Sequence, residues 1–128
     1  MFFNKSGGGV SGMTFTDRGD STTPDYSVDD FTKNLNWYDK DISAIVGVGR
    51  RLVLIQLTTK PTVVTQQWSL RTKGNSFDQN RVFRLAMIAN SVHTYDVWVW
   101  TDASGVIQYK ISGGSWIQYS FYVRGFFS

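Results

Sequence analysis

Polar and apolar residues alternate along much of the chain from Phe31 onward, with the period of two that places successive side chains on opposite faces of a β-strand. The alternation is clearest over 95–100 and 117–123, whereas 52–57 is largely apolar, as in a buried strand. The stretches that predict strands are 35–37, 52–57, 64–72, 82–88, 95–100, 107–111 and 117–123. No helical period exceeds a turn, and we expect one short helix near Ser43–Gly47.

Clusters of turn-forming residues separate these stretches. Asp102–Gly105 and Ser112–Ser115 are typical of hairpin connections, with glycine available for a positive φ. Many short strands joined by such turns are typical of a sandwich or a barrel. We therefore predict an all-β domain, a sandwich or jelly roll of about seven or eight antiparallel strands, with the N-terminal segment supplying the eighth.

The parity of the alternation also predicts which side chains face the core. Trp68 shares a face with Val64, Leu85 shares one with Phe83 and Met87, and Tyr119 shares one with Ile117 and Val123. The residues that we expect to point inward are Leu54, Trp68, Leu85, Val97, Ile107, Tyr119 and Phe121.

The first 30 residues have a different composition. They are rich in glycine, serine, threonine and aspartate, and their large apolar residues are widely spaced. Such a segment buries too little apolar surface to order itself. We predict a flexible Gly/Asp-rich N-terminal arm over 1–30, extended along a neighbouring subunit, and a β-sandwich or jelly-roll domain over 31–128.

Charge is distributed unevenly along the chain. Residues 1–42 hold seven aspartates and four lysines or arginines, a net charge of −3, whereas residues 43–128 hold three aspartates and nine lysines or arginines, a net charge of +6. A basic body attracts nucleic acid, but its basic residues are scattered along the sequence, which favours an ordinary solvated surface. Nucleic-acid binding is therefore a weaker alternative. The chain has no cysteine and no apolar run near the length of a membrane helix.

No recognisable catalytic motif is present. The single histidine, His93, has no evident nucleophile or carboxylate partner, and the Gly7-x-Gly9-x-x-Gly12 pattern lacks the preceding strand and following helix of a dinucleotide site. We expect a protein that is not an enzyme and that has no cofactor and no metal. A weaker alternative is a calcium site built from Asp17, Asp20, Asp25, Asp29 and Asp30.

Two further short motifs have weak predictive value. Arg18-Gly19-Asp20 spells a cell-adhesion tripeptide, and Asn4-Lys5-Ser6 is a glycosylation sequon, but motifs of three residues occur often by chance.

Aromatic residues are in excess of what one small core buries. The chain has five tryptophans, six tyrosines and nine phenylalanines, and several of them lie on both faces of successive strands near the C-terminus. We expect the surplus to form contacts with other subunits in a homo-oligomer, with a trimer favoured. The residues of this predicted interface are Phe2, Phe3, Trp98, Trp100, Trp116, Tyr122, Arg124, Phe126 and Phe127.

Several stretches resemble small structural proteins of tailed bacteriophages and prophages. The resemblance lies in 17–20, 30–32, the run from Trp37 to Val46, and the ending with 107–110, Trp116 and Tyr122-Val123-Arg124-Gly125-Phe126. It implies a virion component made in the bacterial cytoplasm, without a membrane partner, that contacts the major capsid protein or other virion subunits. The preferred expectation is a capsid decoration (cement) protein, and the alternative is a tail-associated receptor- or glycan-binding module.

Overall fold

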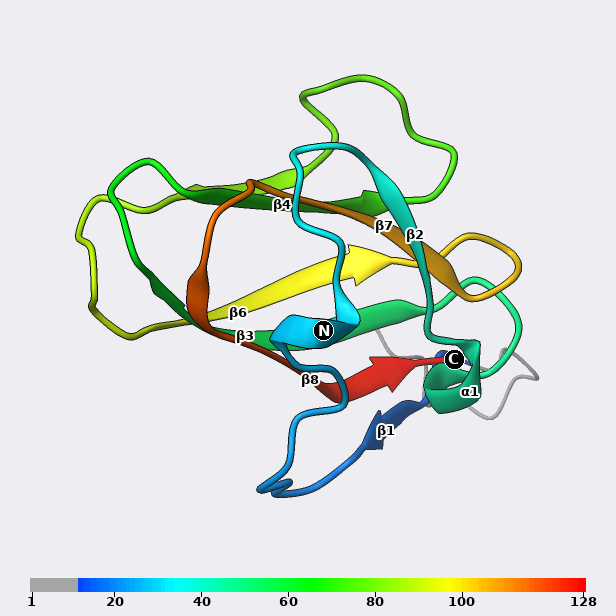
Figure 1. Cartoon of the computed structure of the whole chain (residues 1–128). Helices are drawn as coiled ribbons and strands as arrows, with labels where there is room; N and C mark the ends of the chain where they lie inside the picture. Colours follow the sequence, from blue (N-terminus) through cyan, green and yellow to red (C-terminus); the bar gives the residue numbers. More distant parts are fainter. Residues whose placement is uncertain (1–11) are drawn as a thin grey trace.

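The chain folds into strands with almost no helix (Figure 1). A computed structural model describes residues 12–128. The strands are β1 (Phe15–Asp17), β2 (Tyr38–Asp41), β3 (Leu52–Pro61), β4 (Gln67–Thr72), β5 (Val82–Leu85), β6 (His93–Trp100), β7 (Val106–Ile111) and β8 (Trp116–Phe127). A 3₁₀ turn, η1 (Val28–Asp30), and a single-turn helix, α1 (Ser43–Val46), complete the elements, and α1 lies where the sequence predicts a turn of helix. No helix in the described part of the chain is both long enough and apolar enough to span a membrane.

The strands form two antiparallel sheets of four, with the orders β1-β8-β3-β6 and β2-β7-β4-β5. Strand β1 pairs with β8, β2 with β7, β3 with β6 and β4 with β5, so the chain follows one long antiparallel hairpin rolled into two layers (Figure 1). Further pairing of β3 with β8 and of β4 with β7 closes each sheet. This is the topology of a double-sheet jelly roll. The predicted all-β sandwich is confirmed, including the eighth strand from the N-terminal segment.

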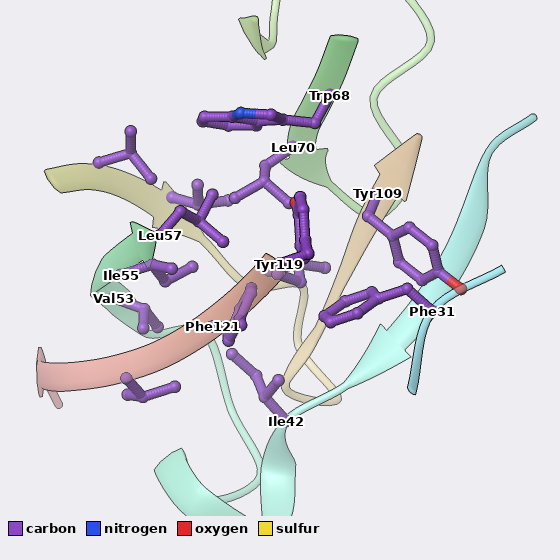
Figure 2. Close-up of a cluster of buried hydrophobic side chains, with 14 of the residues drawn as sticks. Phe31, Ile42, Val53, Ile55, Leu57, Trp68, Leu70, Tyr109, Tyr119 and Phe121 are labelled. Atoms are coloured by element: carbon purple, nitrogen blue, oxygen red, sulfur yellow. The ribbon is translucent and has the colours of Figure 1, made fainter. Parts of the chain in front are cut away.

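The core lies between the two sheets, as Figure 2 shows. In β3 every second side chain is buried, beginning with Val53, Ile55 and Leu57. Five of the residues predicted to point inward are indeed buried, namely Trp68, Val97, Ile107, Tyr119 and Phe121. Period-two parity therefore identifies the core face wherever polar residues mark the opposite face.

Two predicted core residues, Leu54 and Leu85, lie outside the core. Leu54 falls in an apolar run without a polar face to reveal its parity, and its register opposite Trp98 and Gly125 turns it outward. Leu85 ends the short edge strand β5 and pairs with Gln67 on the solvent side, where its side chain is exposed. Met87 and Val64 are exposed because they lie beyond the ends of β5 and β4.

Irregular pairing in β8 alters the parity at both of its ends. Opposite β3, the register passes from Lys60–Gln118 to Pro61–Trp116, so Ile117 is an extra residue with no partner of its own. This shift buries Trp116 and leaves Ile117 52% exposed, although the sequence pattern places Ile117 on the inner face. A second shift, between Val123 and Gly125, leaves Arg124 as the extra residue.

The predicted free arm is wrong for the part of it that the structure describes. Strand β1 pairs with β8 of the same chain, and the backbone of Tyr26 exchanges hydrogen bonds with Phe121. Asp25 accepts hydrogen bonds from the backbone N–H of Val123 and from Arg18, both at 2.7 Å. Backbone pairing and the partly buried carboxylate of Asp25 thus hold a segment that has few apolar residues. The arm residues 1–11 lie outside the described part of the chain.

Candidate functional site

The outer side of sheet β1-β8-β3-β6 presents a group of large apolar side chains to solvent. We call this group the aromatic face; its residues are Phe15, Leu52, Leu54, Trp98, Trp100 and Phe127. The Trp98 side chain is 47% exposed and that of Phe15 39% exposed. Single exposed apolar residues are ordinary on protein surfaces, but a contiguous group on one sheet indicates a contact surface.

Strand register brings these side chains together. Leu52 lies between Trp100 on β6 and Phe127 on β8, and Phe15 on β1 lies opposite Phe127. The ring centroids of Phe15 and Phe127 are 5.0 Å apart, and those of Trp98 and Phe127 are 6.0 Å apart with nearly parallel planes. These rings are in the range of favourable aromatic pairs, so they form one surface rather than separate exposed groups.

Gly125 allows this surface to form. A Cβ atom at this position would overlap the ring of Phe15 and would lie 2.6 Å from the carbonyl oxygen of Thr16. Glycine therefore lets β1 approach β8 and lets the Phe15 ring lie over the sheet. Sequence reasoning did not select Phe15, because the pairing partner that places it is 112 positions away in the chain.

A depression of about 430 Å³ lies on the same outer side, lined by Phe15, Asp17, Leu54, Gln56, Asp96, Trp98 and Arg124. The Nη1 atom of Arg124 donates a hydrogen bond to Oε1 of Gln56 at 3.2 Å, whereas its buried Nε has no partner among the described residues. Within residues 12–128, neither Arg124 nor Asp96 forms an ion pair. The depression therefore combines exposed rings with polar groups that retain hydrogen-bonding capacity.

The predicted interface residues divide into three groups. Trp98, Trp100, Tyr122, Arg124 and Phe127 come together on the outer side of this sheet. Two others lie toward the core: Trp116 is only 6% exposed and donates its indole N–H to the carbonyl of Ser112, and Phe126 is partly buried and packs against the core. Phe2 and Phe3 lie outside the described residues.

The other sheet presents a basic surface. Four residues that are scattered in the sequence gather on the outer side of sheet β2-β7-β4-β5, and we call them the cationic face: Arg71, Lys73, Arg81 and Lys110. Sequence spacing gives no sign of this cluster, because its members come from β4, the turn after it, the residue before β5 and the distant strand β7. The two outer faces of the sandwich therefore differ in chemistry.

The remaining candidate chemistry is not assembled in the structure. His93 stacks on Tyr95, with ring centroids 6.3 Å apart. The aspartates of the alternative calcium site are not assembled, since no group of three or more potential ligands in residues 12–128 could hold a metal ion. In the adhesion tripeptide, the Arg18 guanidinium is bonded to Asp25 and to the carbonyl of Val123.

Comparison of the chain with protein-family models, with curated proteins and with solved structures finds no match. The jelly-roll fold occurs in proteins of many functions, so the function of this protein has to be inferred from the aromatic face and the cationic face.

Proposed function

We propose that this protein is a non-enzymatic structural protein of a bacteriophage virion, and specifically a capsid decoration (cement) protein. The observation that carries the proposal is the aromatic face, which offers a contiguous apolar contact area on a small domain. Tryptophan is among the side chains that most often dominate the energy of protein contacts, and phenylalanine is enriched in interfaces. The sequence resemblance to small phage structural proteins supports the same proposal.

The aromatic face has the composition of a subunit contact. Its centre consists of rings and leucines, and the charged groups Asp17, Asp96 and Arg124 lie in the depression beside them. An apolar centre with polar groups around it is the usual arrangement of an interface. In a shell with many equivalent positions, modest contacts of this kind would add through multivalency and hold the shell together.

We expect the double variant Trp98→Ser/Trp100→Ser to bind capsid shells of the encoding phage about 30-fold more weakly than the wild type, since each lost ring removes a principal contact. Cosedimentation with purified shells measures the binding, and sedimentation velocity measures self-association. Ile117→Ser is the matched control. Ile117 is an exposed apolar residue, and it lies at the opposite end of β8 from Phe127 and the aromatic face. A wild-type protein that remains monomeric at micromolar concentration and does not bind shells would contradict the cement proposal.

The depression favours a second candidate function, a tail-associated module that binds a glycan. Aromatic rings stack on the apolar faces of sugars, and the carboxylates, amide and guanidinium around Trp98 are groups that bond to sugar hydroxyls. The volume of the depression is within the usual range of small-ligand sites.

For this second candidate, we expect simple sugars and disaccharides to alter the tryptophan fluorescence of the wild type, and Trp98→Ala to raise the dissociation constant about tenfold. Trp37→Ala is the control, because Trp37 lies on the other sheet beside Arg71. If both variants respond to sugar equally, the depression is not a glycan site. The number of copies per virus particle distinguishes the two proposed functions, since a capsid decoration protein is abundant and a tail module is scarce.

A further inference from the structure

We propose that the cationic face binds the phosphate backbone of nucleic acid, through Arg71, Arg81 and Lys110. This proposal concerns the outer side of the sheet opposite the aromatic face, so it goes beyond the proposed function and does not depend on it. The three cations converge on one face, each is held by its neighbours, and none of them has an acidic partner within residues 12–128.

The three cations converge around Ser69 in the middle of β4. Nη1 of Arg81 donates a hydrogen bond to Oγ of Ser69 at 3.3 Å, and Lys110 on β7 is directly opposite Ser69 in the register. Arg71 is two residues further along β4 and therefore on the same side of the sheet. Ser69 is buried although it faces outward, as expected if the stems of these long side chains cover it.

Arg71 is held in place by its neighbours. Its guanidinium lies 3.8 Å from the centroid of the Trp37 ring, and its Nε donates a hydrogen bond to Oε1 of Gln108 at 2.9 Å. Gln108 in turn donates to Asp39, which is paired with Lys73 at 2.7 Å. The two terminal nitrogens of Arg71 have no partner within residues 12–128, so the ordered side chain keeps a free fork of donors.

Arg81 and Lys110 are held in a similar way. The guanidinium of Arg81 lies 4.6 Å from the centroid of the Phe83 ring, and the ammonium of Lys110 lies 5.0 Å from that of Trp37. Because these contacts restrict the cations in the free protein, less conformational entropy remains to be lost when an anion binds.

The cations have no acidic partner of their own. In residues 12–128, none of the three forms an ion pair, and the carboxylate of Asp39 is already bonded to Lys73 and Gln108. Arg71 and Lys110 are diagonal neighbours on adjacent strands, and like charges on one face of a sheet repel each other. An anion from outside the protein would offset this repulsion between the cations. It would also accept hydrogen bonds from donors that are ordered but unused.

The aromatic contacts indicate which part of a nucleic acid is recognised. The rings of Trp37 and Phe83 are covered by cations, so they are not free to stack on bases. Arginine forks match phosphate geometry, and a backbone repeats its phosphates at intervals that several cations on one sheet can meet together. We therefore expect binding that is independent of base sequence and sensitive to salt.

The test is fluorescence anisotropy of a short labelled duplex DNA titrated with the purified protein at several salt concentrations. Three phosphate contacts predict about a 40-fold weaker affinity at 200 mM than at 50 mM salt, from a slope of about −0.9 per contact. The triple variant Arg71→Gln/Arg81→Gln/Lys110→Gln is expected to lose binding and its salt dependence.

The control is Arg50→Gln/Lys60→Gln/Arg84→Gln, which removes the same charge away from the cationic face and is expected to retain most of the affinity. If the triple variant does not fold, the single variants Arg81→Gln and Lys110→Gln are tested instead. Each should make the slope of log affinity against log salt concentration shallower by about 0.9, the value for one phosphate contact. Three results would overturn the proposal: no binding of DNA at 50 mM salt, an equal loss in the control, or binding of heparin without binding of DNA.

Discussion

The variant Trp68→Ala is expected to lower the free energy of unfolding by about 3–5 kcal/mol. The indole is only 2% exposed between the sheets, and its ring meets the edge of Tyr95 at a centroid distance of 5.6 Å. Removing it leaves a cavity that the surrounding strands cannot fill, because both sheets are held by their ladders. Urea unfolding followed by circular dichroism measures the loss.

Trp98→Ala is the matched control for this experiment. It removes the same side chain from the outer face, where it is 47% exposed, and should cost less than about 1 kcal/mol. An equal loss in both variants, or a loss below about 1 kcal/mol at Trp68, would show that Trp68 is not a core residue.

The variant Phe31→Ala is also expected to lower the free energy of unfolding by about 3–5 kcal/mol. The Phe31 ring is buried, with its centroid 5.0 Å from those of both Tyr109 and Tyr119, as Figure 2 shows for the ring positions. It also meets Tyr26 at 6.2 Å and so ties the preceding segment to the core. Hydrogen exchange should show faster exchange at the amides of Arg18 and Tyr26, which are bonded to β8.

Leu35→Ala is the control, because this nearby side chain is exposed. If the amides of the segment exchange at the unprotected rate in the wild type as well, the segment does not pack on the body and behaves as a free arm.

The general architecture could be predicted from the sequence because turn clusters and period-two alternation are local signals. Parity was correct at Trp68, Val97 and Ile107, where polar residues mark the solvent side. It was wrong at Leu54, since an apolar run has no marked side, and at Ile117, since an extra residue in β8 shifts the pattern. Neither error can be found without knowing the pairing partner.

The N-terminal segment was misjudged for a different reason. Its apolar residues are too sparse to suggest a packed element, yet Tyr26 is enough when it packs on Phe31 and Phe121 of a core that the rest of the chain has formed. Much of what holds it is backbone pairing with β8 and the hydrogen bonds accepted by the partly buried carboxylate of Asp25. Such bonds depend on tertiary position and leave no pattern in the composition.

The candidate sites were predictable only in part. Aromatic excess draws attention to Trp98, Trp100 and Phe127, which the strand register places on one side of a sheet, but Phe15 joins them only through the β1–β8 pairing. The cationic face was missed, because spacing along the sequence says little about residues that neighbouring strands bring together.

The rolled hairpin has a consequence for synthesis on the ribosome. Strand β3 lies between β6 and β8, and β8 is also the partner of β1, so the first sheet lacks its central pairing until the last strand has emerged. Until then β3 presents an unpaired edge in its apolar stretch, the kind of edge that pairs with other chains.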